Sequence, residues 1–290
     1  MWNSNRTLLL TFLVVSFGKC LSAQVISEAL LSFPTQTEYV EYDNLAMLRT
    51  LPSYPALRER FSGKPLDDAK AALAKLGIPE DQVREIVSGS SATAFYGLAG
   101  GTFSGDAVAR SANAKNSTKL LESRAFCPGG QTCVVFLENS IAAFGTLSQL
   151  KELLEVRQGF ATSLNSNRNV VSLLNGTDSH APVRGVVFGG QLKNAISDML
   201  KDSIGWNKDW SGLSSNVSSI GYSVKFDAKS HVVAKLECTS RTAASVLVQM
   251  LSAVGSLESS SDGSFQNLQV SSSGNIIDFK ADSALPAVAH

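Results

Sequence analysis

The sequence has few of the residues from which catalytic and metal sites are usually built. Its 290 residues include three histidines and four cysteines. His290 is the last residue, which leaves His180 and His231 as the histidines placed to take part in a site. A structural zinc site needs about four sulfur or imidazole ligands at close spacing, and no paired histidines supply them. We therefore expect neither a metal ion nor a cofactor.

Long apolar runs and an excess of one charge are also absent. No apolar run reaches the roughly 20 residues that a transmembrane helix needs. The 25 basic residues balance the 25 acidic residues, so nothing favours a nucleic acid or an anionic lipid as partner. A hydrophobic content of 44% with 17% charged residues excludes a disordered chain and suffices for a sizeable core.

The first 23 residues are typical of a cleavable signal peptide. A weakly basic start that ends at Arg6 precedes an apolar stretch over residues 7–18, and small residues lie around Ser22 and Ala23. We predict cleavage after Ser22 or Ala23, and export to the periplasm or the cell exterior.

Export would leave a mature chain with a formal charge of −2. The leader contains two of the 25 basic residues, Arg6 and Lys19, so 23 remain against 25 acidic residues. We expect no integral membrane segment after cleavage. A lipid anchor on Cys20 would need a small residue before it, and Lys19 stands there instead, so a released protein is favoured over a lipoprotein.

Two cysteines are placed to form a disulfide bond. Cys127 and Cys133 enclose the turn-forming residues Pro-Gly-Gly-Gln-Thr, and strand-like residues flank them on both sides. In an oxidising compartment this pattern predicts a Cys127–Cys133 disulfide across a hairpin turn. The five-residue gap does not match a CxxC redox pair. Cys238 is predicted to be a buried free thiol.

Strand-like and helix-like patterns alternate along the mature chain and predict an α+β fold. Strands are expected over residues 38–42, 83–88, 92–103, 119–126, 132–137, 141–144, 183–188, 220–226, 231–236, 268–272 and 275–279. Helices are expected over residues 45–61, with breaks at two prolines, and over 65–76, 106–115, 147–157, 191–200 and 241–257. This order implies antiparallel or mixed sheets with helices packed on one face.

An internal similarity divides the chain in two. The segments 134–144 and 223–233 share a pattern of strand, polar turn and strand, and a strand-glycine-helix unit precedes each of them. This predicts two ferredoxin-like pseudo-repeats, an N-terminal half over 24–170 and a C-terminal half over 171–283, or else one continuous domain. Residues 284–290 are predicted to be a disordered tail.

No stretch of the sequence carries a complete catalytic motif, and we predict no catalytic residues. The glycine-rich residues 97–105 lack both the GxGxxG spacing and the lysine of a P-loop, so they indicate tight strand-to-helix packing. Asp178, Ser179 and His180 have the residue types of a triad, but neighbours on one loop do not take up its geometry. No GxSxG elbow is present.

Two tryptophans are the best candidates for an exposed ligand-binding patch. Trp206 and Trp210 are four residues apart and would stack on one side of a turn or short helix as a platform for a sugar or a peptide. Alternatively, the two rings close the gap between the two halves.

Three segments carry a resemblance to other proteins. They are residues 33–49, which begin Phe33-Pro34, residues 96–103, which begin Tyr96-Gly97, and residues 144–154, which begin Phe144-Gly145. In these segments the chain resembles a group of uncharacterised exported bacterial proteins. The resemblance implies a bacterial protein of the periplasm or the cell surface, and it transfers no site residues.

The sequence predicts a regular α+β fold but contains no catalytic motif. We therefore consider three functional hypotheses. The first is an exported, non-enzymatic envelope module that binds a protein, a peptide or an envelope polymer through the exposed face or edge of its sheet. The second is a carrier of a small apolar ligand or lipid between the two halves. The third is a hydrolase, with His180 as its best residue.

Overall fold

The protein is built on one long sheet with helices packed against it. The computed structural model describes residues 24–54, 64–111, 117–192, 215–227, 229–258 and 266–284. Its strands are β1 (Tyr39–Asp43), β2 (Val83–Ser90), β3 (Phe95–Gly101), β4 (Ser117–Leu120), β5 (Ser123–Phe126), β6 (Cys133–Glu138), β7 (Ile141–Gly145), β8 (Val183–Phe188), β9 (Val217–Phe226), β10 (Lys229–Cys238), β11 (Gln266–Ser273) and β12 (Ile276–Ala284). Its α-helices are a helix over residues 24–32, α2 (Leu45–Leu48), α4 (Lys64–Lys75), α5 (Gly105–Ser111), α6 (Leu147–Arg157), α7 (Arg168–Asn175) and α10 (Arg241–Glu258), and two short 3-10 helices are η1 (Glu80–Gln82) and η3 (Leu164–Ser166).

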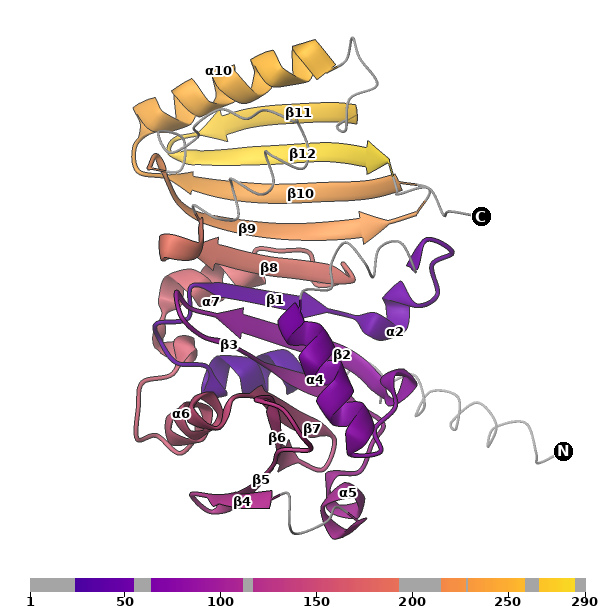
Figure 1. The fold of residues 1–290 in the computed structure, drawn as a ribbon. Coiled ribbons are helices and arrows are strands. Elements are labelled where there is room, and N and C mark those ends of the chain that lie inside the picture. The colour runs from indigo at the N-terminus through magenta and orange to yellow at the C-terminus, as the bar shows by residue number, and fades with distance from the viewer. Residues whose placement is uncertain are drawn as a thin grey trace, which may run out of the picture.

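The twelve strands form a single antiparallel sheet, which confirms the α+β class expected from the sequence. Their order is β11-β12-β10-β9-β8-β1-β2-β3-β7-β6-β5-β4 (Figure 1). Every neighbouring pair is antiparallel. Among the described helices, none has the length and apolar character needed to cross a bilayer.

The first strand of the chain lies in the middle of the sheet. Val40 of β1 is opposite Gly89 of β2 on one side and Val186 of β8 on the other. The sheet therefore continues without a break from the segment 24–170 into the segment 171–283. The expected boundary between these segments, after Val170, falls inside α7.

The internal similarity does not extend to the pairing of the strands. The strand before the first hairpin, β3, pairs with the second strand of that hairpin, β7. The strand before the second hairpin, β8, pairs with its first strand, β9. The two segments therefore do not repeat a ferredoxin-like arrangement, because a shared sequence pattern sets the local hairpin but not its neighbours in the sheet.

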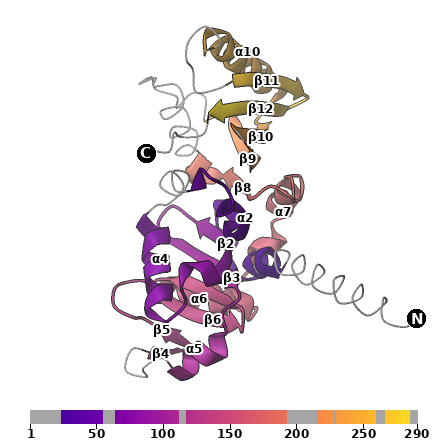
Figure 2. The same cartoon turned by 90° about the vertical axis from the view of Figure 1, so that its right-hand side faces the viewer.

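Helices cover both faces of the sheet over β2, β3, β6 and β7, which corrects the expectation of helices on a single face. On one face Val87 and Leu98 pack with α6, α7 and the helix over 24–32. On the other face Ile86 and Ala99 pack with α2 and α4. Figure 2 shows α4 and α7 on opposite sides. Strands such as β3 and β7 are buried at nearly every position, so both of their faces are covered by other elements.

The disulfide predicted from the sequence is present. Cys127 and Cys133 are bonded, and the adjacent residues Phe126 and Val134 pair β5 with β6, so the bond closes the turn of a hairpin. Residues 119–126, expected as one strand, contribute to both β4 and β5, because the chain turns at Leu121, which has a φ of 54°. Cys238 is a buried free thiol, and burial raises its pKa, which disfavours the reactive thiolate.

The glycine-rich segment packs tightly against its neighbours, as the sequence predicts. A Cβ on Gly97 would lie 2.4 Å from the ring of Phe144, and a Cβ on Gly101 would lie 2.0 Å from the carbonyl oxygen of Gln82. The Tyr96 ring lies 5.1 Å from the ring of Phe33 in an edge-on contact. The three segments that carry the resemblance therefore meet in one part of the core.

Candidate functional site

Among the described residues, the end of the sheet formed by β10, β12 and β11 has helix α10 packed on one of its faces. Ala234 of β10 and Phe279 of β12 are buried on the side of α10. Val233 and Lys280, which alternate with them along these strands and lie opposite each other, are exposed on the other side. We call this other surface the open face. Its members are Ser219, Gly221, Ser223, Lys225, His231, Val233, Lys235, Glu237, Gln269, Ser271, Ser273, Ile276, Asp278, Lys280 and Asp282.

A groove of about 530 Å³ lies between α7 and the open face. Its lining comes from α7 and the loop after it, from β9 and β10, and from Ile276 of β12. A Cβ on Gly221 would lie 3.4 Å from the carbonyl oxygen of Leu173, so α7 packs directly on β9 at this point. The volume is in the range of sites that bind small molecules or short chain segments, about 300–1,000 Å³.

Helix α7 forms one wall of the groove, and the sequence analysis did not predict this helix. Its signals are nevertheless present. Asn167 caps it by accepting a hydrogen bond from the backbone N–H of Val170, and Gly176 follows its last turn. Val170 and Leu174, four residues apart, are buried against the sheet. An N-cap followed by apolar residues at helical spacing would have located it.

Cationic side chains line the groove on its sheet side. Lys225 of β9 forms an ion pair with Asp178 in the loop after α7, and this ammonium, with the backbone N–H of His180, lowers the pKa of the Asp178 carboxyl. Lys235 of β10 is exposed and has no ion-pair partner among the described residues. Ser223 adds a hydroxyl at the base of the groove. Asp278 of β12 lies opposite Lys235 on the same face, so an incoming ligand meets an ammonium whose charge is partly offset.

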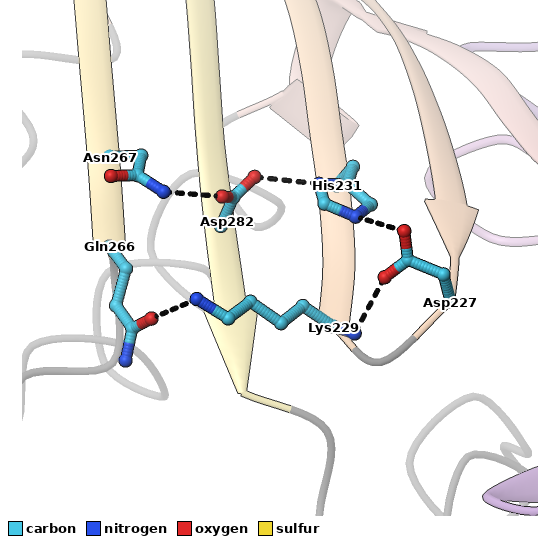
Figure 3. A network of polar contacts seen from close by, with 6 residues as sticks. All are labelled: Asp227, Lys229, His231, Gln266, Asn267 and Asp282. Carbon is cyan, nitrogen blue, oxygen red and sulfur yellow. Dashed lines mark hydrogen bonds and ion pairs between the residues drawn. The ribbon is translucent and has the colours of Figure 1, made fainter.

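His231 lies at one end of the groove, between two carboxylates (Figure 3). Its Nε2 is 2.9 Å from Asp227 and its Nδ1 is 2.7 Å from Asp282. Asn267 of β11 donates a hydrogen bond of 2.7 Å to the second oxygen of Asp282, and Lys229 donates its backbone N–H to Asp227. The two carboxylates raise the pKa of His231, and the hydrogen bond from Asn267, with His231, lowers the pKa of Asp282.

We expect His231→Gln to lower the free energy of unfolding in mildly acidic solution and to have little effect in alkaline solution. The pKa of His231 is raised in the fold, so its contribution is complete below its ordinary value of about 6.5 and is lost as pH rises through the raised value. The side chains of His231 and Asp282 are 38% and 21% exposed and that of Asp227 is 69% exposed, so water screens the pairs and the expected effect is below about 1 kcal/mol. Urea titrations at about pH 5.5 and about pH 9 measure it.

The matched control for this prediction is His180→Gln, since His180 is 86% exposed in its side chain and has a single carboxylate neighbour at 3.6 Å. We expect a smaller loss of stability for the control than for His231→Gln at about pH 5.5, because the side chain of His180 is mostly exposed. If His231→Gln lowered the free energy of unfolding equally at both pH values, His231 would not be an ion-paired imidazolium in the fold.

The geometry of these histidines suits binding more than proton transfer. Both ring nitrogens of His231 face carboxylates, so neither is left to accept a proton from a nucleophile. At His180 the hydroxyl of Ser179 and the carboxylate of Asp178 both approach the same nitrogen, Nδ1, at 3.4 and 3.6 Å. A triad needs one partner on each ring nitrogen. The loop therefore has the residue types of a triad without its geometry.

A second groove, of about 500 Å³, lies where the segments 24–170 and 171–283 adjoin. Met47 of α2, Leu51 after that helix and Phe226 of β9 contribute apolar surface to it. Four ionisable side chains also line it, from Arg84, Glu85, His180 and Lys225. The lining of this second groove therefore combines apolar surface with ionisable groups.

A carboxylate cluster lies on the side of the sheet opposite the open face. The hydroxyl of Tyr222 donates to Glu41, and burial raises the pKa of both side chains. Burial also raises the pKa of Asp43, two residues further along β1. Glu41 and Asp43 line neither groove, so they do not form a cleft with converging carboxylates at the candidate site.

The two candidate tryptophans, Trp206 and Trp210, lie outside the described residues, as do the signal peptide over 1–23 and most of the tail over 284–290. The groove residues replace them as the candidate site. Across the described ranges, no group of three or more histidine, cysteine, aspartate and glutamate side chains is arranged to hold a metal ion.

Comparison with known proteins gives a likeness of fold. No family model matches the chain, and no curated protein matches it in sequence. Crystal form I of TP0453 is similar over 89% of this chain and 93% of that chain, with a TM-score of 0.55 and 11% identity. Crystal form III of TP0453 gives a TM-score of 0.50 and 8% identity over 89% and 94% of the two chains. At these identities, the likeness to TP0453 is one of fold alone.

Proposed function

We propose that this chain is an exported, non-enzymatic module that binds an extended segment of a partner protein in the groove between α7 and the open face. The observation that carries the proposal is the groove itself. It has a volume of about 530 Å³, the ammonium of Lys235, which forms no ion pair with a described residue, and no complete catalytic arrangement among the described side chains that line it.

The lining favours an extended ligand of mixed polarity, because apolar surface exceeds polar surface in it. Gly221 and Ser223 leave the base of the groove open, because neither carries a large side chain. Leu173 and Val233 supply apolar walls, while Lys235 offers a positive charge to a carboxylate of the ligand. An extended peptide with an acidic side chain meets these requirements. An envelope polymer with acidic groups shares the same chemistry.

Two further observations support export. The Cys127–Cys133 disulfide is of the kind that persists in oxidising compartments. The first residues have the composition of a signal peptide. We propose the periplasm or the cell exterior as the place of action, with the mature chain beginning near Gln24.

We expect Lys235→Glu to weaken ligand binding by about tenfold or more, because it replaces an ammonium in the lining of the groove with a charge that repels an acidic ligand. The probe is a displayed library of random 12-residue peptides, selected against the mature protein and then measured one by one by fluorescence anisotropy. The matched control is Lys280→Glu, a charge reversal on the same open face but outside the groove.

The two variants distinguish binding in the groove from a general effect of charge on the open face. If the selected peptides bind Lys235→Glu and Lys280→Glu equally well, the groove is not the binding site. If selection enriches no peptide at all, the proposal that the groove takes a peptide segment is wrong. An unchanged midpoint of thermal unfolding for both variants would show that the comparison is made on folded protein.

A further inference from the structure

The groove between α7 and the open face runs along the strands. At one end its lining includes Lys225 of β9 and His231 of β10, which are opposite each other in the sheet. Toward the other end it includes Lys235, further along β10, and Ile276, which is opposite Glu237. Because a strand rises about 3.3 Å per residue, the steps from His231 to Glu237 cover about 20 Å. A ligand of this groove is therefore expected to be extended and parallel to the strands.

Two lysines lie along this lining, both on the open face. Lys225 is opposite His231 and Lys235 is opposite Gly221, so their positions are four residues apart along neighbouring strands. Four residues of strand amount to about 13 Å, and the step to the neighbouring strand adds about 4.8 Å at a right angle, which puts the two Cα atoms about 14 Å apart. An extended ligand would therefore pass two cationic side chains in turn.

The two lysines differ in what they contact among the described residues. Lys235 forms no ion pair there, although Asp278 lies opposite it in the sheet. The ammonium of Lys225 pairs with Oδ2 of Asp178, which itself lines the groove, and Oδ1 of Asp178 accepts the backbone N–H of His180 at 2.9 Å. The side chains of Lys225 and Asp178 are 53% and 37% exposed. A carboxylate of the protein therefore occupies one of the two cations, at a place that solvent reaches.

A carboxylate of a ligand can take the place of Asp178 at little cost. Ion pairs with this much exposure contribute little to stability, and a displaced Asp178 would keep the N–H of His180 and gain water. An extended peptide has the right geometry, because side chains four residues apart lie on the same face and about 13 Å apart. With a spacing of three or five residues, the second side chain lies on the opposite face of the peptide.

We propose that the groove recognises an extended peptide segment with two acidic residues four positions apart, one on Lys235 and the other on Lys225, where it displaces Asp178. This inference rests on the proposed function and adds to it the sequence pattern of the partner. Asp178 is then an internal competitor that lowers the affinity for every segment with this pattern. The spacing of the two charges, as well as their sign, determines which segments bind.

The first test varies the spacing of the charges at constant net charge. The probes are three peptides of serine and valine with blocked ends and two glutamates, placed three, four or five residues apart. Fluorescence anisotropy with the mature protein measures each dissociation constant. We expect the peptide with the spacing of four to bind about tenfold more tightly than the other two, because a second charge-assisted contact forms at this spacing alone.

The second test removes the internal competitor. Asp178→Asn should bind the peptide with the spacing of four about fivefold more tightly than the wild type, because Lys225 is then free for the ligand. In the double variant with Lys225→Gln, both this gain and the preference for the spacing should be lost, which separates competition from a general loss of negative charge. The matched control is Glu155→Gln, which breaks an exposed ion pair with Lys151 on α6 and should leave binding unchanged. An unchanged midpoint of thermal unfolding shows that each variant is folded.

Three outcomes would overturn the inference. They are equal dissociation constants for the three spacings, no binding of any of the three peptides, and an Asp178→Asn variant that binds the peptide with the spacing of four no better than the wild type does. The proposed function is decided separately, by the library selection and by Lys235→Glu. If library peptides bind the wild type and lose affinity in Lys235→Glu, the groove remains a peptide site even where the spacing pattern fails.

Discussion

Replacing Phe33 by alanine is expected to lower the free energy of unfolding by about 3–5 kcal/mol, because the side chain is fully buried and its removal leaves a cavity. The Phe33 ring packs edge-on against Tyr96 at 5.1 Å and lies where a Cβ on Gly89 would be, at 2.6 Å. It follows the helix over residues 24–32 and anchors that helix to the sheet. Urea titration followed by circular dichroism measures the change.

The chain offers a matched control for Phe33→Ala. Phe160 lies after α6 and is 75% exposed, so Phe160→Ala removes the same atoms without opening a cavity. We expect a change within about 0.5 kcal/mol for this control. Similar losses for the two variants would mean that Phe33 does not occupy the core, and would contradict the docking of the first helix on β2 and β3.

Replacing Gly101 by alanine is expected to cost about 3 kcal/mol, toward the upper end of what overpacking costs. The new Cβ would lie 2.0 Å from the carbonyl oxygen of Gln82, a backbone atom that cannot rotate away. The Gln82 carbonyl also accepts the N–H of Thr102, so movement of either strand disturbs a backbone hydrogen bond. Thermal unfolding and urea titration both measure the effect.

Gly221→Ala is the control for this second prediction. Gly221 is also a buried glycine in a central strand, but its Cβ would have its nearest contact at 3.4 Å, an ordinary van der Waals distance. We expect a small change in stability. A large loss for Gly221→Ala and none for Gly101→Ala would contradict the close approach of β3 to η1.

Local elements were largely predictable because their signals are local. The pattern of residues 147–157 predicts helix α6 with its observed bounds, and the structure adds a capping box at Thr146 and Gln149. The turn residues between Cys127 and Cys133 predict the disulfide-linked hairpin. Alternation of apolar and polar residues predicts β9, β10, β11 and β12, although each of these strands extends beyond its predicted bounds.

The order of the strands could not be predicted in the same way. β1 lies between β2 and β8, and β3 pairs with β7, through contacts between residues far apart in the sequence. The two similar hairpin patterns were interpreted as a repeat, yet their neighbours in the sheet differ. A hairpin pattern specifies the pairing within the hairpin, while the pairing outside it depends on which buried surfaces fit together.

The candidate site depends even more on tertiary structure. Its parts, α7, β9 and β10, are separated along the chain, and α7 had no assigned element in the sequence analysis. The two carboxylate partners of His231, Asp227 and Asp282, come together with it through strand pairing. The spacing of these residues along the sequence does not predict that they form a cluster.

The sequence by itself determined the α+β class, the disulfide, the tight packing of the glycine-rich strand and the lack of a complete catalytic motif, since each depends on residues that are near one another in the chain. Tertiary structure decided the single twelve-stranded sheet, the helices on both faces and the groove. These features depend on which distant surfaces are buried together, and burial is a property of the folded chain as a whole.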